Sequence, residues 1–175
     1  MNESSHVWLV RHARPARQGV FLGRMDVPLD AGAEAESRAG LEQIQAAVVY
    51  CSPLERDWRT AVWIAGADKP TVLADLADLD YGSWQGRSWE EIERTEQEVA
   101  ARKLSDWLGT TPAGGESWAA LELRVARALD TILAGPLPAA IVAHEAVNAV
   151  VAARLAGTDP LVFHQPFGTA LRLEV

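Results

Sequence analysis

Two short apolar runs that stop at histidine constrain the fold of this chain more than any other feature. Residues 7–10 (Val-Trp-Leu-Val) are followed by Arg11 and His12. The run Ala139–Ala143 is followed by His144. Short apolar runs bounded by polar residues are typical of buried strands in a parallel sheet. Ligands of open α/β sheets bind beyond the carboxyl ends of such strands, so we expect these three polar residues in a functional site.

Strand and helix patterns alternate along the rest of the chain. Further strands are expected at 47–51, at 71–74 and at 170–175, where apolar and charged residues alternate as in an edge strand. Helices are expected at 31–46 with Asp30 as cap, from a Ser52 cap to about Ala65, from Ser88 beyond Ala100, at 116–134, and at 145–156. This order predicts a three-layer α/β/α sandwich with a mostly parallel central sheet. A length of 175 residues suits a single domain, 1–175.

Charge and composition exclude several classes of protein. Sixteen Lys and Arg against 24 Asp and Glu give a net charge of -8, which argues against nucleic-acid binding through a basic face. No apolar run is long enough to span a bilayer, and the first residues lack a basic stretch followed by an apolar one. The single cysteine, Cys51, cannot form an internal disulfide. We therefore expect a cytoplasmic protein without nucleic-acid or membrane partners.

The polar residues at the strand ends suit a phosphate ester. Arg56 follows the third predicted strand end, in the first turn of a helix, so it joins Arg11 at the same end of the sheet. Guanidinium groups bind phosphate oxygens in a bidentate manner, and helix N-termini add N–H donors. An acidic loop offers Asp75, Asp78 and Asp80 as proton donors to a leaving group.

These residues also carry a resemblance to a known family. Arg11-His12-Ala13 resembles the Arg-His-Gly signature of the histidine phosphatase superfamily, which has the phosphoglycerate-mutase-like fold. Segments similar to four further family motifs follow in the family's order, at 52–61, 76–86, 114–117 and 143–145. The resemblance spans nearly the whole chain, and the ordered set is far more specific than any one motif.

The resemblance implies a role for each matched residue. His12 is the nucleophile that becomes phosphohistidine, while Arg11, Arg56 and His144 hold the phosphoryl oxygens. Asp78 aligns with the general acid that protonates the leaving oxygen and then activates water. No metal ion and no cofactor are expected, because the arginines supply the positive charge.

Three positions depart from the family pattern. Ala13 and Glu145 stand where the family has glycine, and Asp78 stands where it has glutamate. The Glu145 carboxylate either faces the phosphate site and repels the ligand, or lies in the first turn of the next helix, where negative charge is favourable. Asp78 competes with Asp75 and Asp80 for the donor role. Four residues are candidate substrate contacts: Arg24, Trp84, Glu116 and Glu145.

The resemblance implies a phosphomonoesterase that acts on a small phosphorylated metabolite. The loop at 19–29 is similar to that of compact phosphatases of the family, including the α-ribazole-phosphate phosphatases. Two alternatives stay open: a phosphohistidine protein phosphatase, and a non-catalytic binder of a phosphorylated ligand with a remodelled site. A homodimer through the C-terminal edge strand is a further expectation.

Overall fold

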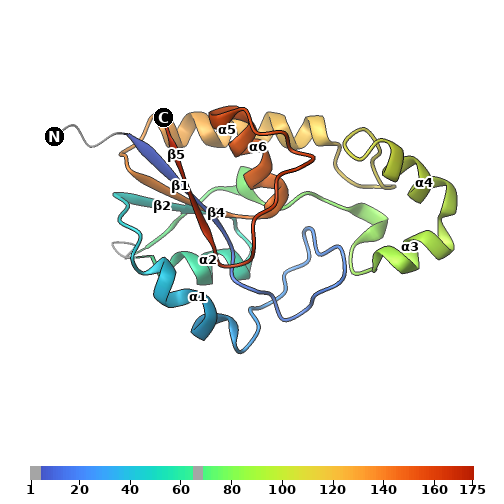
Figure 1. Cartoon of the computed structure of the whole chain (residues 1–175), viewed down its shortest axis with the longest axis horizontal. Coiled ribbons are helices and arrows are strands. Elements are labelled where there is room, and N and C mark those ends of the chain that lie inside the picture. Colours follow the sequence, from blue (N-terminus) through green and yellow to red (C-terminus); the bar gives the residue numbers. More distant parts are fainter. Residues whose placement is uncertain (1–4, 65–68) are drawn as a thin grey trace.

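A five-stranded sheet organises the chain in a computed structural model that describes residues 5–64 and 69–175 (Figure 1). The strand order is β3-β2-β4-β1-β5. Four strands are mutually parallel, and β5 lies at the edge of the sheet as predicted, where it runs antiparallel to β1. The strands are β1 (His6–Arg11), β2 (Val48–Cys51), β3 (Thr71–Val72), β4 (Ala139–Ala143) and β5 (Ala170–Glu174).

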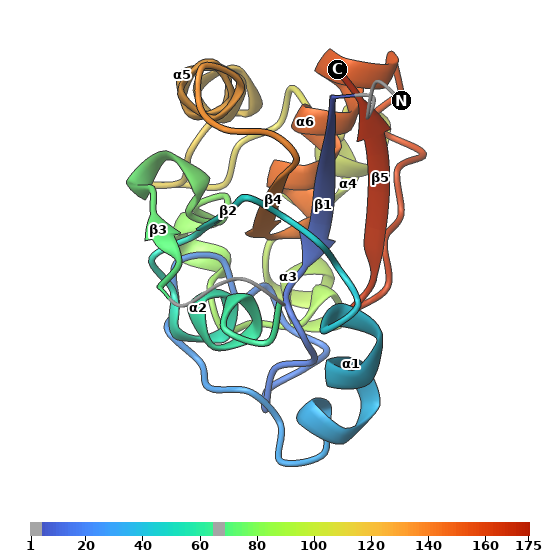
Figure 2. The same ribbon diagram turned by 90° about the vertical axis from the view of Figure 1, so that its left-hand side faces the viewer.

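Helices cover both faces of this sheet, which confirms the three-layer sandwich. They are α1 (Ala33–Leu41), α2 (Glu55–Ala61), α3 (Trp89–Thr95), α4 (Gln97–Ser105), α5 (Trp118–Leu133) and α6 (Glu145–Ala156). Figures 1 and 2 show α5 and α6 on one side of the sheet and α1 and α2 on the other. None of these helices is both long and apolar enough to cross a membrane, within the part of the chain that the structure describes.

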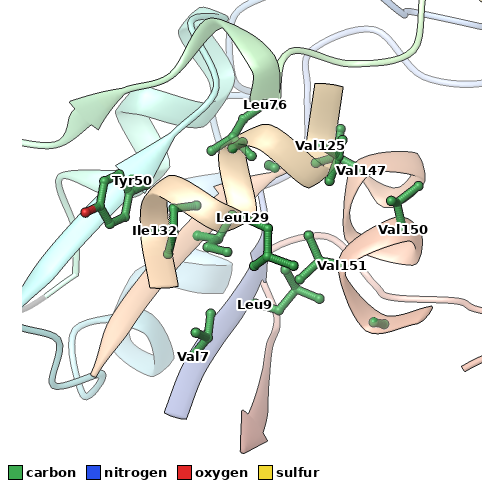
Figure 3. Close-up of a cluster of buried hydrophobic side chains, with 14 of the residues drawn as sticks. Val7, Leu9, Tyr50, Leu76, Val125, Leu129, Ile132, Val147, Val150 and Val151 are labelled. Atoms are coloured by element: carbon green, nitrogen blue, oxygen red, sulfur yellow. The ribbon is translucent and has the colours of Figure 1, made fainter. Parts of the chain in front are cut away.

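Successive strand residues face opposite sides of the sheet, so an apolar core forms on each side. These two cores hold the helix layers against the sheet. Val7, Leu9 and Ile141 pack against α5 and α6 in the larger core, which Figure 3 shows. Val10 and Val142 belong to the core under α1 and α2. All five residues of β4 are buried, as expected of a central strand with a helix layer on each face.

A third cluster lies at one end of the molecule, where α3 and α4 extend away from the sheet (Figure 1). Its buried members are Trp84, Ile92 and Ala100, and Phe21 packs against them. Phe21 thereby attaches the loop after β1 to α3 and α4. The loop and these helices are far apart in sequence, and they lie together beyond the carboxyl ends of the strands.

The predicted boundaries of two helices are wrong. The helix predicted at 31–46 ends at Leu41 instead of Ala46. Asp30 does not cap α1. Its carboxylate instead accepts a hydrogen bond from the backbone of Gly32 in a turn, and the helix begins after that turn. Ser52 does not cap α2, which begins two residues beyond Pro53 after an extended Leu54. The predicted end near Ala65 lies outside the described residues, and the helix that the structure describes ends at Ala61.

The helix predicted from Ser88 beyond Ala100 is two helices. Ser88 forms the expected capping box with Glu91 at the start of α3. The break falls at Glu96, whose backbone is not helical and whose side chain accepts a hydrogen bond from Trp84. The helices α5 and α6 and the strand β4 lie close to their predicted ranges, whereas β3 is shorter than predicted. The dimer expected through β5 stays a prediction.

Leu9 provides a test of the larger core. Its side chain is fully buried between β4 and the helices, so Leu9→Ala should lower the free energy of unfolding by about 2–5 kcal/mol. Leu123→Ala on α5 is the matched control, because Leu123 is 68% exposed and should change stability by less than about 0.5 kcal/mol. Urea titrations followed by circular dichroism measure both. Equal losses in the two variants would contradict this packing.

Candidate active site

The carboxyl ends of three parallel strands meet at one end of the sheet. Arg11 at the end of β1 lies opposite Ala143 at the end of β4, and the next residues are His12 and His144. The two imidazole rings are therefore neighbours, with centroids 5.1 Å apart. The helices that follow β1 and β4, α1 and α6, pack on opposite faces of the sheet. Such a topological switch point is where open α/β sheets bind ligands.

A cavity of about 240 Å³ opens at this point. The loop after β1 supplies one wall and the start of α6 another. The cavity brings together six of the residues predicted from sequence: Arg11, His12, Arg56, Asp78, His144 and Glu145.

His12 is arranged as a neutral nucleophile. Its Nδ1 atom lies 2.8 Å from the carbonyl oxygen of Ala13, which can only accept a hydrogen bond. Nδ1 therefore carries the hydrogen, and the lone pair of the neutral ring is at Nε2. Burial, and next the charge of Arg56, lower the pKa of His12 to about 3. The residue Ala13 itself has no positive φ angle, so the methyl group in place of the family's glycine causes no backbone strain.

Two guanidinium groups face His12. Arg56 is fully buried, and the carbonyl oxygens of Met25 and Gly23 accept its hydrogen bonds at 2.7 and 2.9 Å. Arg11 donates to the carbonyl oxygen of Gln165 at 2.6 Å and lies 3.8 Å from the centre of the Phe167 ring. These contacts hold both cations at the cavity, where each can bind the oxygens of a phosphoryl group.

His144 is bound on its far side by two residues that the sequence analysis missed. Its Nε2 atom lies 2.9 Å from the Ser52 hydroxyl and 3.1 Å from a carboxylate oxygen of Asp57. Its Nδ1 atom faces the cavity, 3.4 Å from the guanidinium of Arg56. Burial, followed by the charges of His12 and Arg56, lowers the pKa of His144 well below its usual value. His144 is therefore neutral and presents Nδ1 to the cavity.

Asp78 is the carboxylic acid of the acidic loop that lies in this cavity. One of its oxygens is 3.4 Å from Arg56 and 3.5 Å from Nδ1 of His144. Burial raises the pKa of Asp78 to about 6, while the charge of Arg56 opposes the rise. The other two candidate donors are engaged elsewhere: Asp75 pairs with Arg127 on the surface, and Asp80 accepts the backbone N–H of Gly82.

Comparison with known proteins identifies the family. Residues 7–170 match the sequence model of the histidine phosphatase superfamily (branch 1). The chain belongs to this superfamily. Its members are phosphatases. Among the described residues, no group of three or more His, Cys, Asp or Glu side chains is placed to hold a metal ion.

Relatives of the chain include compact phosphatases. An adenosylcobalamin/alpha-ribazole phosphatase from Salmonella typhimurium is 28% identical over 158 residues, which cover 85% of this chain and 78% of the relative. The crystal structure of an alpha-ribazole phosphatase from Shigella flexneri has the same fold, with a TM-score of 0.84, 23% identity and coverage of 97% of this chain and 90% of that one. The crystal structure of the protein TTHB049 from Thermus thermophilus gives a TM-score of 0.74 at 31% identity, covering 97% and 92% of the two chains.

In this histidine phosphatase, Arg124 holds the loop that carries Asp78. Its guanidinium donates to the carbonyl oxygens of Asp75, Ala77 and Asp78 at 2.7, 2.6 and 2.9 Å. It also binds the carboxylate of Glu116 through two hydrogen bonds of 2.6 and 2.8 Å. Arg124 thus joins the loop at 75–78 to Glu116 and fixes the backbone that presents the acid. The sequence does carry one indication of this role, since Arg124 lies on the buried, apolar face of a helix.

The four candidate substrate contacts have different surroundings. Trp84 is fully buried in the third core cluster, donates to Glu96 and lines neither cavity, so the prediction that it contacts the substrate is wrong. Arg24 lies 3.6 Å from Glu116 and lines neither this cavity nor a larger one beside it. Glu116 lines the larger cavity, with its carboxylate bound to Arg124. Glu145 lines both cavities and is also the first residue of α6.

Asp57 gives a prediction about the stability of this histidine phosphatase. Burial raises the pKa of Asp57 well above 3.8, with the charge of Arg56 acting in the opposite direction. The folded protein therefore keeps a proton on Asp57 that the unfolded chain releases near its usual pKa. Stability from this group is complete below about pH 3.8 and is lost as the pH rises toward the raised folded-state pKa.

The test compares wild type with Asp57→Asn, which is close to isosteric and does not titrate. Urea titrations at several pH values should show wild type losing unfolding free energy relative to the variant as the pH rises from about 4, with a limiting slope of about 1.4 kcal/mol per pH unit. All other titrating groups are common to both proteins. A stability difference that does not change with pH would show that Asp57 is ionised in the folded state.

Proposed function

We propose that this histidine phosphatase is a phosphomonoesterase that hydrolyses a small phosphorylated metabolite through a phosphohistidine intermediate on His12. The observation that carries the proposal is the position of neutral His12. Its Nδ1 hydrogen is held by Ala13, and the ring lines the cavity with Arg11, Arg56 and Asp78. A nucleophile, two cations and a carboxylic acid are the groups that the transfer of a phosphoryl group from an ester requires.

In the first step, the Nε2 lone pair of His12 attacks phosphorus and the bond from phosphorus to the ester oxygen breaks. Asp78 gives its proton to the leaving oxygen, so the product is a neutral alcohol. Arg11 and Arg56 bind oxygens of the transferred group, where negative charge is spread in the transition state. His144 donates to a further oxygen through an Nδ1 hydrogen, because the protonated carboxyl group of Asp57 donates to its Nε2 atom. The two arginines supply the charge stabilisation, and the proposed mechanism needs no metal ion.

In the second step, the Asp78 carboxylate accepts a proton from a water molecule that attacks the phosphohistidine. The bond from phosphorus to Nε2 breaks and the electron pair returns to the ring. Inorganic phosphate leaves, and both His12 and Asp78 regain their starting protonation states. The carboxyl group of Asp78 therefore acts as the acid in the first step and as the base in the second. The second step is chemically the reverse of the first, with water in place of the alcohol.

One contact supports a second candidate function, a non-catalytic binder of a phosphorylated ligand. Glu145 lies 3.1 Å from Arg11 and competes with a phosphoryl group for that guanidinium. A protein of this kind would bind phosphorylated compounds without turnover. The first experiment separates the two functions.

Phosphate release from a panel of small phosphomonoesters, α-ribazole phosphate among them, tests the proposal. Wild type should release phosphate, and His12→Ala and His12→Gln should lose essentially all of that activity because both variants lack the attacking nitrogen. His6→Ala is the matched control, since His6 lies at the opposite end of β1. A His12 variant as fast as wild type contradicts the mechanism. A folded wild type that binds esters but never releases phosphate favours the binder.

The pH dependence follows from the two pKa values. His12 must be unprotonated and Asp78 protonated, so kcat/KM for an alkyl ester should rise through about pH 3 and fall through about pH 6. Asp78→Asn should lower this rate by about 10²–10⁴-fold. The loss should be smaller for p-nitrophenyl phosphate, whose leaving group needs little protonation. Equal losses on both esters would remove Asp78 from the acid role.

A further inference from the structure

A second, larger cavity joins the one that contains His12. Its volume is about 460 Å³, within the range of small-molecule sites. The two cavities share Phe21, Tyr81, Glu145 and Ala146 as lining residues. A phosphoryl group bound beside His12 therefore has its ester oxygen near a ring-sized space, and that space is where the alcohol portion of a substrate fits.

Five of the sixteen residues that line the larger cavity are aromatic. Trp107, Trp118 and Phe163 line it together with the shared rings of Phe21 and Tyr81. Aromatic faces attract cations and stack on planar groups. They offer nothing to compensate an anion for its lost hydration.

The cation Lys103 lines this cavity with a side chain that is largely buried. The ammonium of Lys103 donates to the carbonyl oxygen of Thr110 at 2.7 Å and lies 5.0 Å from the centre of the Trp107 ring. Among the carboxylates, Glu116 is bound by Arg124 on the wall of the cavity. The other lining carboxylate is Glu145, which lies at the junction of the two cavities.

Glu145 is held rigidly at that junction. One carboxylate oxygen lies 3.1 Å from the Arg11 guanidinium. The other accepts the backbone N–H of Gln165 at 3.1 Å and lies 2.8 Å from Nδ1 of His164. The side chain is still 34% exposed, so its charge acts on whatever enters. When a phosphoryl group binds, Arg11 interacts with two anions, the phosphoryl group and the Glu145 carboxylate. It therefore neutralises less of the charge of Glu145.

We infer that Glu145 is a specificity residue that rejects anionic leaving groups, so that the substrates are phosphomonoesters of ring-sized alcohols that are uncharged or cationic. This inference rests on the proposed phosphatase function and adds a class of substrate to it. An added negative charge in the larger cavity is repelled by Glu145, and an ammonium group is attracted by Glu145 and by the rings. When two charges near the protein surface are separated by the length of one or two side chains, their interaction changes the affinity for the substrate by about tenfold.

Three aryl esters of similar size and similar leaving-group pKa test this inference. They are tyramine phosphate, which is cationic, para-ethylphenyl phosphate, which is uncharged, and phosphorylated para-hydroxyphenylpropionate, which is anionic. At about pH 6, wild type should show a kcat/KM ratio of about ten or more between the cationic and the anionic ester. In Glu145→Gln this ratio should approach one, chiefly because KM for the anionic ester falls.

The uncharged ester and a second variant serve as controls. Any effect of Glu145→Gln on phosphate binding through Arg11 alters all three esters alike and cancels in the ratio. Glu90→Gln makes the same change of net charge on an exposed residue of α3 that lines neither cavity, and it should keep the wild-type ratio. A wild-type kcat/KM ratio near one, or an unchanged ratio in Glu145→Gln, overturns this inference but does not contradict the proposed phosphatase function. Failure of wild type to hydrolyse any of the three esters contradicts the proposed function as well.

Discussion

The parallel pairing of β1 with β4 is the constraint on which the rest of the site depends. Because Arg11 lies opposite Ala143, the residues that follow, His12 and His144, emerge side by side. A shift of one residue in this register would turn the alternating side chains of β1 toward the wrong cores. The same apolar packing that fixes the sheet therefore fixes the distance between the two imidazole rings.

Burial then determines the charge of each group at this end of the sheet. Removal from water favours neutral imidazole in His12 and His144 and a protonated carboxyl in Asp78. The charge of Arg56 opposes the effect of burial on Asp78, and the balance leaves its pKa at about 6. Burial and one guanidinium thus produce a neutral nucleophile beside an acid that titrates close to physiological pH, which is the pairing that general acid catalysis needs.

The elements whose structure depends on residues close together in the sequence could be predicted from the sequence. The strand β4 and the helix α6 follow from a local apolar run and from Gly157, whose positive φ ends the helix. Contacts between distant segments could not be predicted in the same way. Trp84 donates to Glu96 at the break between α3 and α4, and Asp57 contacts His144, which follows a different strand. The sequence showed that Glu145 departs from the family pattern. Its place at the start of α6 agrees with the helix predicted at 145–156, whereas its contact with Arg11 required the structure.

The most direct test of the central claim is to trap the phosphorylated enzyme. Wild type is mixed rapidly with an isotopically labelled phosphomonoester, quenched in alkali to preserve phosphohistidine, digested and analysed by mass spectrometry. We predict label on the peptide that contains His12, attached at Nε2, at a stoichiometry that rises before phosphate release reaches its steady rate. Label on His144, or steady release of phosphate with no labelled peptide under the same quench, would contradict the assignment of His12 as the nucleophile.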